Sequence, residues 1–183
     1  AAVEEKGIRR IDIDNGDLWH ASAMKADGSG FTVALDNTDL GAVTWSLLGM
    51  HNVDNALSAI AASRHVGVPT NVAIEALSRF GGVKRRMELF AEKDGLRCYD
   101  DFAHHPSAIR TTLQGLRKHV GNEHILAIVE PRTHTMSLGT LRDELCHCAA
   151  PADEVIWFRS ESMQWDLTEL VNQSLAAASV END

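Results

Sequence analysis

The sequence predicts an α/β protein whose C-terminal part is a Rossmann-like, mostly parallel sheet with flanking helices. From residue 87 onward, strand-like apolar runs alternate with helix-like ones. This β-α-β-α order is typical of a right-handed wound sheet. Before residue 80, several strands come first and two helices follow, which indicates a different unit. We therefore expect one domain over 1–80, a linker or hinge over 81–86 and a second domain over 87–183.

Composition excludes several classes of protein. The 183 residues are 44% hydrophobic and 23% charged, as in ordinary globular domains. A formal charge of −9 argues against a broad nucleic-acid surface. No apolar run approaches the roughly 18 residues of a membrane span, and no signal peptide is recognisable. We expect a cytoplasmic protein in which all three cysteines are reduced, because an odd number does not suit a disulfide framework.

The first 46 residues read as a set of short strands with turns between them. The strand candidates are 8–13, 18–24, 31–35 and 40–46. The run Asp27-Gly28-Ser29-Gly30 is a turn signal, so residues 31–35 are expected to return as the second strand of a hairpin.

The pattern then changes to a helical period. Apolar residues recur at Val53, Ala56, Leu57, Ile60 and Ala61, which predicts a helix with one buried face, capped by Asn52 and stopped at Gly67. A second helix is expected from Pro69 to Gly81, with its inward side formed by Ala73, Ile74, Leu77 and Phe80.

Beyond residue 87 the chain begins with a hairpin, since Asp94-Gly95 separates the runs 87–93 and 96–100. A helix over 107–119 follows, with Ile109, Leu113 and Leu116 inward. The apolar run 124–130 predicts a strand covered on both faces. The remaining candidates are a helix marked by Leu138, Leu141, Leu145 and Cys148, a strand over 154–158, and a last helix that opens at Asp166, passes Leu175 and leads to the chain end.

The chemistry concentrates in Asp100-Asp101-Phe102-Ala103-His104-His105-Pro106, between a strand and a helix. Pro106 suits the first helical position, and a helix N-terminus favours anions. These side chains could bind Mg²⁺ or a nucleotide ribose, or they could simply cap the helix. Zinc is less favoured, because ligands that share a helix face are three or four residues apart, whereas His104 and His105 are adjacent.

Three further stretches allow both a functional and an ordinary interpretation. Asn52 and Asn55 share a helix face and could contact a purine, or Asn52 is only a cap. Lys84-Arg85-Arg86 could bind a polyphosphate or be a solvated linker. Glu130-Pro131-Arg132-Thr133-His134 follows a strand, so Arg132 could hold a carboxylate or form a surface ion pair. Because ligands bind beyond the carboxyl ends of parallel strands, this stretch and residues 100–105 are expected on one edge.

Taken together, these motifs resemble the Mur ligase family, the ATP-dependent amide-forming enzymes of peptidoglycan assembly. The matching stretches are Gly49-Met50-His51-Asn52-x-x-Asn55-Ala56, Gly82-x-x-Arg85-Arg86-x-Glu88, residues 100–106, and Glu130-Pro131-Arg132. Their order fits the family over roughly residues 40 to 160. The sequence lacks a Gly-x-x-Gly-Lys-[Ser/Thr] phosphate loop. The resemblance therefore implies the strand-and-helix tail of a central ATPase domain, then a C-terminal ligase domain, with the N-terminal domains missing.

The resemblance also implies an activity. It is the joining of L-alanyl-γ-D-glutamyl-meso-diaminopimelate tripeptide to UDP-N-acetylmuramate in peptidoglycan recycling, through an acyl phosphate, with ATP and Mg²⁺. Asn52 and Asn55 would contact adenine, Arg86 the nucleotide, Asp101 the ribose, and His104 the phosphates. Arg132 and His134 would bind the peptide. This chain alone would be inactive, and Gly81-Gly82 would be the hinge on which the C-terminal domain closes.

Other functions stay open at this stage. A relative that adds L-alanine to UDP-N-acetylmuramate shares the same motifs. A non-catalytic nucleotide-binding module would explain the absent phosphate loop, and a metal-dependent hydrolase could use the acidic and histidine residues of 100–105.

Overall fold

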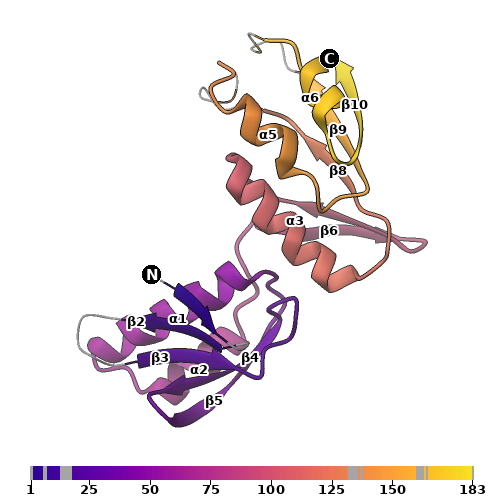
Figure 1. Cartoon of the computed structure of the whole chain (residues 1–183). Coiled ribbons are helices and arrows are strands. Elements are labelled where there is room, and N and C mark those ends of the chain that lie inside the picture. Colours follow the sequence, from indigo (N-terminus) through magenta and orange to yellow (C-terminus); the bar gives the residue numbers. More distant parts are fainter. Residues whose placement is uncertain are drawn as a thin grey trace. The chain divides into compact units, whose positions relative to one another are not determined.

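The computed structural model describes residues 2–5, 8–12, 18–131, 136, 138–159, 163 and 165–182. The chain forms two compact units, Ala1–Asp100 and Asp101–Asp183. Figure 1 shows both units with most of their elements labelled. The domain boundaries at residues 80 and 87 stay a prediction.

The first unit begins with a five-stranded antiparallel sheet in which every strand pairs with its neighbour in the sequence. The four predicted strands are confirmed, and a further one, β1, precedes them. Every second residue of the short β3 is buried, Trp19 and Ala21, so this strand presents one face to the core. The strands are β1 (Ala2–Glu5), β2 (Ile8–Asp12), β3 (Leu18–Ser22), β4 (Gly30–Leu35) and β5 (Thr38–Thr44).

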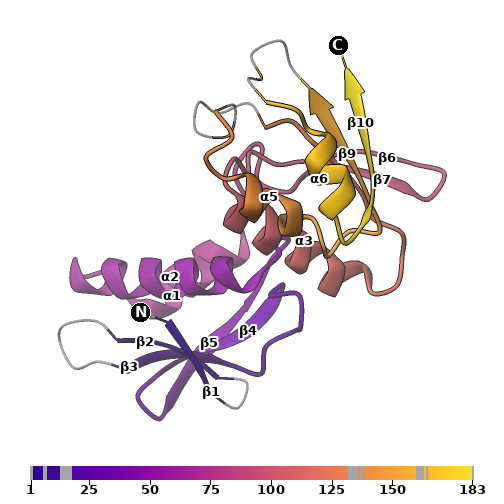
Figure 2. The same cartoon turned by 45° about the horizontal axis from the view of Figure 1, so that its top comes forward.

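Two helices, α1 (Met50–His65) and α2 (Thr70–Ser78), lie side by side on one face of this sheet (Figure 2). The five apolar positions predicted for the buried face of α1 are all buried, and they pack with Trp19, Phe31 and Val33 of the sheet. The helical period thus correctly predicts which side of α1 forms the core.

Two details of these helices differ from the prediction. Gly49, not Asn52, is the cap residue of α1, because the helix begins two residues before Asn52. Phe80 was expected inward, but α2 ends at Ser78 and the Phe80 side chain is 42% exposed. The prediction for Phe80 assumed that the helix continues to residue 80, and a residue beyond the helix end does not follow the helical period.

A two-stranded antiparallel hairpin follows, made of β6 (Glu88–Lys93) and β7 (Leu96–Asp100). Its turn residues Asp94 and Gly95 have φ angles of +52° and +83°. Both signs match the Asp-Gly turn that the sequence predicts, since this turn needs a left-handed backbone at both central positions.

The second unit is a wound α/β domain. Its sheet is parallel, in the order β10-β9-β8, with helices between successive strands. The predicted fold class is therefore confirmed. None of the helices among the described residues is long and apolar enough to cross a membrane. The elements are α3 (Pro106–Val120), β8 (Leu126–Val129), α5 (Arg142–Cys148), β9 (Glu154–Arg159), α6 (Thr168–Gln173) and β10 (Ala177–Asn182).

Three predictions in this unit are wrong. Leu126 and Ile128 are 47% and 68% exposed, so β8 is covered on one face and not on both. The last helix does not lead to the chain end, because α6 stops at Gln173 and β10 follows. Leu138 precedes α5 and is exposed. At Leu126, Ile128 and Leu138, the apolar residue type suggested burial that the described part of the chain does not supply.

Candidate functional site

The loop before α3 is held by contacts between its own residues. The Asp101 carboxylate accepts the Ala103 backbone N–H at 2.8 Å, which is the short-range turn that Asp commonly forms. The Phe102 and His104 rings lie 5.2 Å apart and are tilted against each other. His105 is the cap residue of α3, and Pro106 is its first residue, which is the position that the sequence predicts for this proline.

The two neighbouring histidines use the same ring nitrogen in opposite ways. His104 Nδ1 lies 3.1 Å from the Phe102 carbonyl oxygen, which can only accept, so this nitrogen is the donor. His105 Nδ1 accepts the Ser107 backbone N–H at 3.3 Å and lies 2.8 Å from the Ser107 hydroxyl. From these partners we assign the proton of neutral His104 to Nδ1 and that of neutral His105 to Nε2. His104 then offers an Nε2 lone pair, and His105 offers an Nε2–H donor.

The other end of α3 shows which end of the sheet the loop faces. Arg117, in the last turn of α3, donates to the carbonyl oxygens of Glu123 and Pro151 and forms an ion pair with Asp153. These partners precede β8 and β9, so the C-terminal end of α3 lies at the amino ends of the strands. The N-terminal end of α3, with Asp101 and His104 before it, therefore points toward the carboxyl ends, where wound sheets bind ligands.

Arg85 and Arg86, in the cationic run before β6, differ in their surroundings. Arg85 has a φ of +59°, its backbone N–H donates to Glu88 Oε2 at 2.9 Å, and its guanidinium lies 3.5 Å from Asp100 Oδ2. Sequence reasoning missed this pair, although both residues stand in the stretches it singled out. Arg86 is exposed. Arg85 thus fixes the backbone beside the hairpin, and Arg86 presents its charge to solvent.

The two asparagines of α1, Asn52 and Asn55, also differ in their surroundings. The Asn52 amide donates to the Leu48 carbonyl at 2.8 Å, and its residue is half-buried. Asn55 is exposed. Asn52 thus holds the first turn of the helix, and the Asn55 side chain lies at the surface. These two residues belong to the first unit, whereas Asp101 and His104 belong to the second.

The remaining predicted site residues, Arg132 and His134, lie outside the described residues. The strand before them ends at Val129, Glu130 is exposed and Pro131 is buried. The point where this stretch leaves β8 is thus at the carboxyl edge of the sheet.

The described part of the chain contains no group of three or more His, Cys, Asp or Glu side chains that could hold a metal ion. The cysteines are free, and two of them are buried in α5. Burial raises the pKa of the Cys148 thiol to about 12 and also raises the pKa of Cys146, with a smaller contribution from the Asp143 charge. Thiols with raised pKa values stay protonated near neutral pH and are poor nucleophiles.

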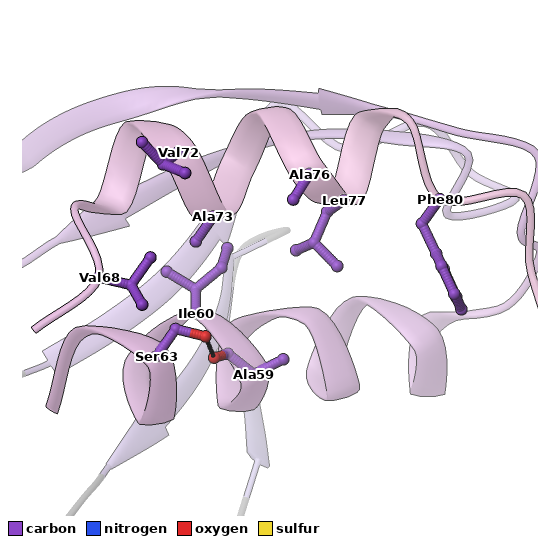
Figure 3. Close-up of a pocket in the computed structure, with 9 residues that line it drawn as sticks. All are labelled: Ala59, Ile60, Ser63, Val68, Val72, Ala73, Ala76, Leu77 and Phe80. Atoms are coloured by element: carbon purple, nitrogen blue, oxygen red, sulfur yellow. Dashed lines mark hydrogen bonds between the residues drawn. The ribbon is translucent and has the colours of Figure 1, made fainter. Parts of the chain in front are cut away.

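A hollow of about 270 Å³ lies between α1 and α2. Figure 3 shows its apolar side chains, among them Ile60, Val72 and Phe80. The hydroxyl among them, that of Ser63, donates to the Ala59 carbonyl at 2.7 Å. None of the described side chains that line this hollow is charged, so it does not suit a triphosphate.

Comparison with known proteins shows which family this chain resembles. The family model described as "Mur ligase, glutamate ligase domain" matches residues 85–182. The UDP-N-acetylmuramate–L-alanyl-γ-D-glutamyl-meso-2,6-diaminoheptandioate ligase of Escherichia coli (strain K12) is 43% identical over 161 residues, which are 87% of this chain and 35% of that protein. The UDP-N-acetylmuramate–L-alanine ligase of Desulfitobacterium hafniense is 38% identical over 130 residues, 71% of this chain and 29% of that protein.

A solved structure agrees with the sequence comparison. The murein peptide ligase of Psychrobacter arcticus matches with a TM-score of 0.64 and 40% identity, covering 93% of this chain and 37% of that one. The chain thus spans about a third of the length of the relatives it matches. On the family match over residues 85–182, the chain belongs to the Mur ligase family, and it carries the glutamate ligase domain of that family.

Proposed function

We propose that this chain is the C-terminal part of an ATP-dependent ligase that joins L-alanyl-γ-D-glutamyl-meso-diaminopimelate to UDP-N-acetylmuramate in the cytoplasm. The observation that carries the proposal is the 43% identity over 161 residues with the E. coli ligase whose name states these substrates. The corresponding identity with a ligase named for L-alanine is 38%, over 130 residues. The tripeptide is therefore favoured as the amine component.

The proposed reaction has two steps. The muramate carboxylate takes the terminal phosphoryl group of ATP, which gives an acyl phosphate and ADP. The tripeptide amine then attacks the acyl carbon, the amide bond forms, and inorganic phosphate leaves with the electrons of the broken C–O bond. Such chemistry depends mainly on positioning and on stabilising negative charge, which are tasks for side chains at fixed distances.

The side chains of this chain divide these tasks as follows. Asn55 contacts the adenine, and Asn52 keeps the helix start in the shape that presents it. Asp101 accepts from the ribose hydroxyls while its turn with Ala103 holds it in place, and Arg86 contributes charge to the nucleotide. His104 lies near the phosphates. Arg132 and His134 bind the tripeptide, with the arginine on a carboxylate.

Mg²⁺ accompanies ATP in this proposal, and the described residues include no group of three or more His, Cys, Asp or Glu side chains that could hold the ion by itself. The Asp100 carboxylate forms an ion pair with Arg85, and Asp101 is assigned to the ribose in this proposal. The ion is therefore assigned to ATP and to residues outside the described part.

The test is an assay of the full-length protein that carries this chain. We expect ATP-dependent formation of UDP-N-acetylmuramoyl-tripeptide, detected by mass spectrometry, together with ADP and phosphate in equal amounts. We expect no product from the 183-residue chain alone. A full-length protein that accepts L-alanine and not the tripeptide would refute the proposed substrate, and one that hydrolyses ATP with neither would refute the ligase activity.

A further inference from the structure

Arg86 stands between two residues whose backbone is left-handed. Arg85 has a φ of +59° and Met87 a φ of +50°. Neither is a glycine, and the left-handed region is unfavourable for residues that carry a Cβ. Backbone strain of this kind persists only where surrounding contacts hold it, and it is common at ligand-binding sites. The contacts that hold the turn over residues 84–87 therefore decide where Arg86 lies.

Two carboxylates face each other at the open end of the β6–β7 hairpin. Glu88, the first residue of β6, pairs with Asp100, the last residue of β7. Side chains of directly opposed residues in an antiparallel pair lie on the same face of the ladder, and like charges there destabilise it. A positive charge beside this pair of carboxylates would offset their repulsion.

Arg85 contacts both of these carboxylates. Its backbone N–H donates to Glu88 Oε2 at 2.9 Å, and its guanidinium Nε lies 3.5 Å from Asp100 Oδ2. The first contact holds the turn at the start of β6, and the second joins the same residue to the opposite strand. Arg85 is thus held at its backbone and at its side chain, while the next residue, Arg86, is exposed.

We propose that Arg85 and Asp100 are positioning residues for the nucleotide. Their ion pair keeps the turn over residues 84–87 at the end of the hairpin and so fixes the point from which the Arg86 side chain extends. This inference rests on the proposed function, in which Arg86 contributes charge to the nucleotide. Arg85 and Asp100 act through Arg86 and are assigned no contact with the nucleotide. Both residues, with Glu88, belong to the first unit.

The variant Asp100→Asn tests the proposal, because positioning and simple charge predict opposite results. It keeps the shape of the side chain and removes one negative charge. If only the local charge mattered, ATP, an anion, would bind better and its KM would fall. If the ion pair positions Arg86, the KM for ATP in the full-length protein should rise about fivefold, the upper end of what an exposed ion pair contributes.

The other two substrates show whether the effect is specific. With ATP saturating, the KM values for UDP-N-acetylmuramate and the tripeptide should change less than about twofold, since neither is assigned to Arg86. A residue that merely stabilises the fold would not separate the three substrates in this way.

A double variant shows whether the two side chains act as a pair. Arg85→Gln alone should raise the KM for ATP by about the same factor as Asp100→Asn. The double variant Arg85→Gln/Asp100→Asn should raise it no further, because two residues that act through one contact are not additive. If net charge alone were responsible, the double variant would return to the value of the unaltered protein.

A matched control exists in the same unit. Glu75 and Arg79 form an exposed ion pair at the end of α2. Glu75→Gln breaks this pair and should leave the KM for ATP unchanged. Hydrogen exchange of the full-length protein, followed by mass spectrometry, gives a second measurement that needs no substrate. The peptide that contains residues 83–88 should exchange faster in Asp100→Asn and not in Glu75→Gln.

The outcomes separate the two proposals. If the unaltered protein joins the tripeptide but Asp100→Asn has the same or a lower KM for ATP, the positioning role is wrong and the proposed function stands. An equal rise of all three KM values, an equal rise in Glu75→Gln, or unchanged hydrogen exchange in Asp100→Asn also overturns the positioning role. If the unaltered protein has no ATP-dependent ligase activity, both proposals fail.

Discussion

Arg117 and Asp153 form an ion pair that joins the last turn of α3 to the residue before β9. The same carboxylate accepts the Ile125 backbone N–H at 2.7 Å, just before β8. One carboxyl group thus connects three elements at the amino edge of the sheet. Through it, α3 is oriented with Asp101 and His104 toward the opposite edge.

This arrangement predicts a pH dependence of stability. The Ile125 N–H and the Arg117 guanidinium hold the pKa of Asp153 below its ordinary value of 3.8. The unfolded chain therefore binds a proton more readily than the folded one. The stabilisation is complete well above 3.8, and it is lost as the pH falls through the lower, folded pKa. Urea unfolding between about pH 6 and about pH 3 should show this loss.

The variant Asp153→Asn identifies the group responsible. It should be less stable than the unaltered chain at neutral pH, and its stability should fall less steeply in acid. Asp94→Asn removes a charge from the exposed β6–β7 turn and serves as the control. Part of the acid dependence should remain, because the two hydrogen bonds from Thr168 hold the pKa of Asp166 low as well. If the free energy of unfolding of Asp153→Asn falls with pH as steeply as that of the unaltered chain, Asp153 is not the group responsible.

The opposite hydrogen bonding of His104 and His105 predicts opposite tautomers. The measurement is made on the neutral form of both rings. Nitrogen-15 chemical shifts should then place the proton of His104 on Nδ1 and that of His105 on Nε2. In Ser107→Ala, the His105 signal should shift and that of His104 should not. The same tautomer at both residues would remove the basis for giving them different roles.

Gly139 and Gly121 allow the Trp165 packing to be separated from backbone strain. Both have a positive φ, +76° and +64°, but a Cβ at Gly121 would meet nothing within 4 Å. Gly121→Ala should therefore show only the strain of a left-handed backbone, about 1 kcal/mol of the free energy of unfolding. In Gly139→Ala the added Cβ also presses on the indole of Trp165, so this variant should lose clearly more free energy of unfolding. Equal losses in chemical denaturation would argue against close packing at Trp165.

The asparagines of α1 should separate stability from nucleotide binding. Asn52→Ala loses the hydrogen bond to Leu48 and should reduce the free energy of unfolding by about 1 kcal/mol. Asn55→Ala changes an exposed side chain, so stability should stay within about 0.5 kcal/mol. In the full-length protein, Asn55→Ala should still raise the KM for ATP severalfold. An unchanged KM would exclude Asn55 from the proposed nucleotide site.

The sequence predicts the local structure well where one physical rule acts alone. The buried face of α1 follows from helical period, the β6–β7 turn from Asp-Gly, and the start of α3 from Pro106. The prediction fails where burial depends on partners distant in the sequence. The exposure of Ile128 and the position of β10 both depend on how the sheet is completed, which periodicity does not encode.

In the candidate site, too, the sequence predicts local features and misses contacts between distant residues. Sequence motifs singled out Asp101 and His104, and Asn52 with Asn55, because their residue types and spacing are unusual. They did not distinguish the engaged Asn52 from the exposed Asn55, and they did not reveal the ion pair of Arg85 with Asp100. Contacts between residues far apart in the sequence leave no periodic signal, so only the fold brings them into view.

A competition experiment with the full-length protein tests most directly which amine component the ligase uses. Equal concentrations of the tripeptide and L-alanine are supplied with UDP-N-acetylmuramate and ATP, and the two products are separated by mass. We expect UDP-N-acetylmuramoyl-tripeptide to be the main product and its formation to require ATP. UDP-N-acetylmuramoyl-L-alanine as the main product would contradict this expectation.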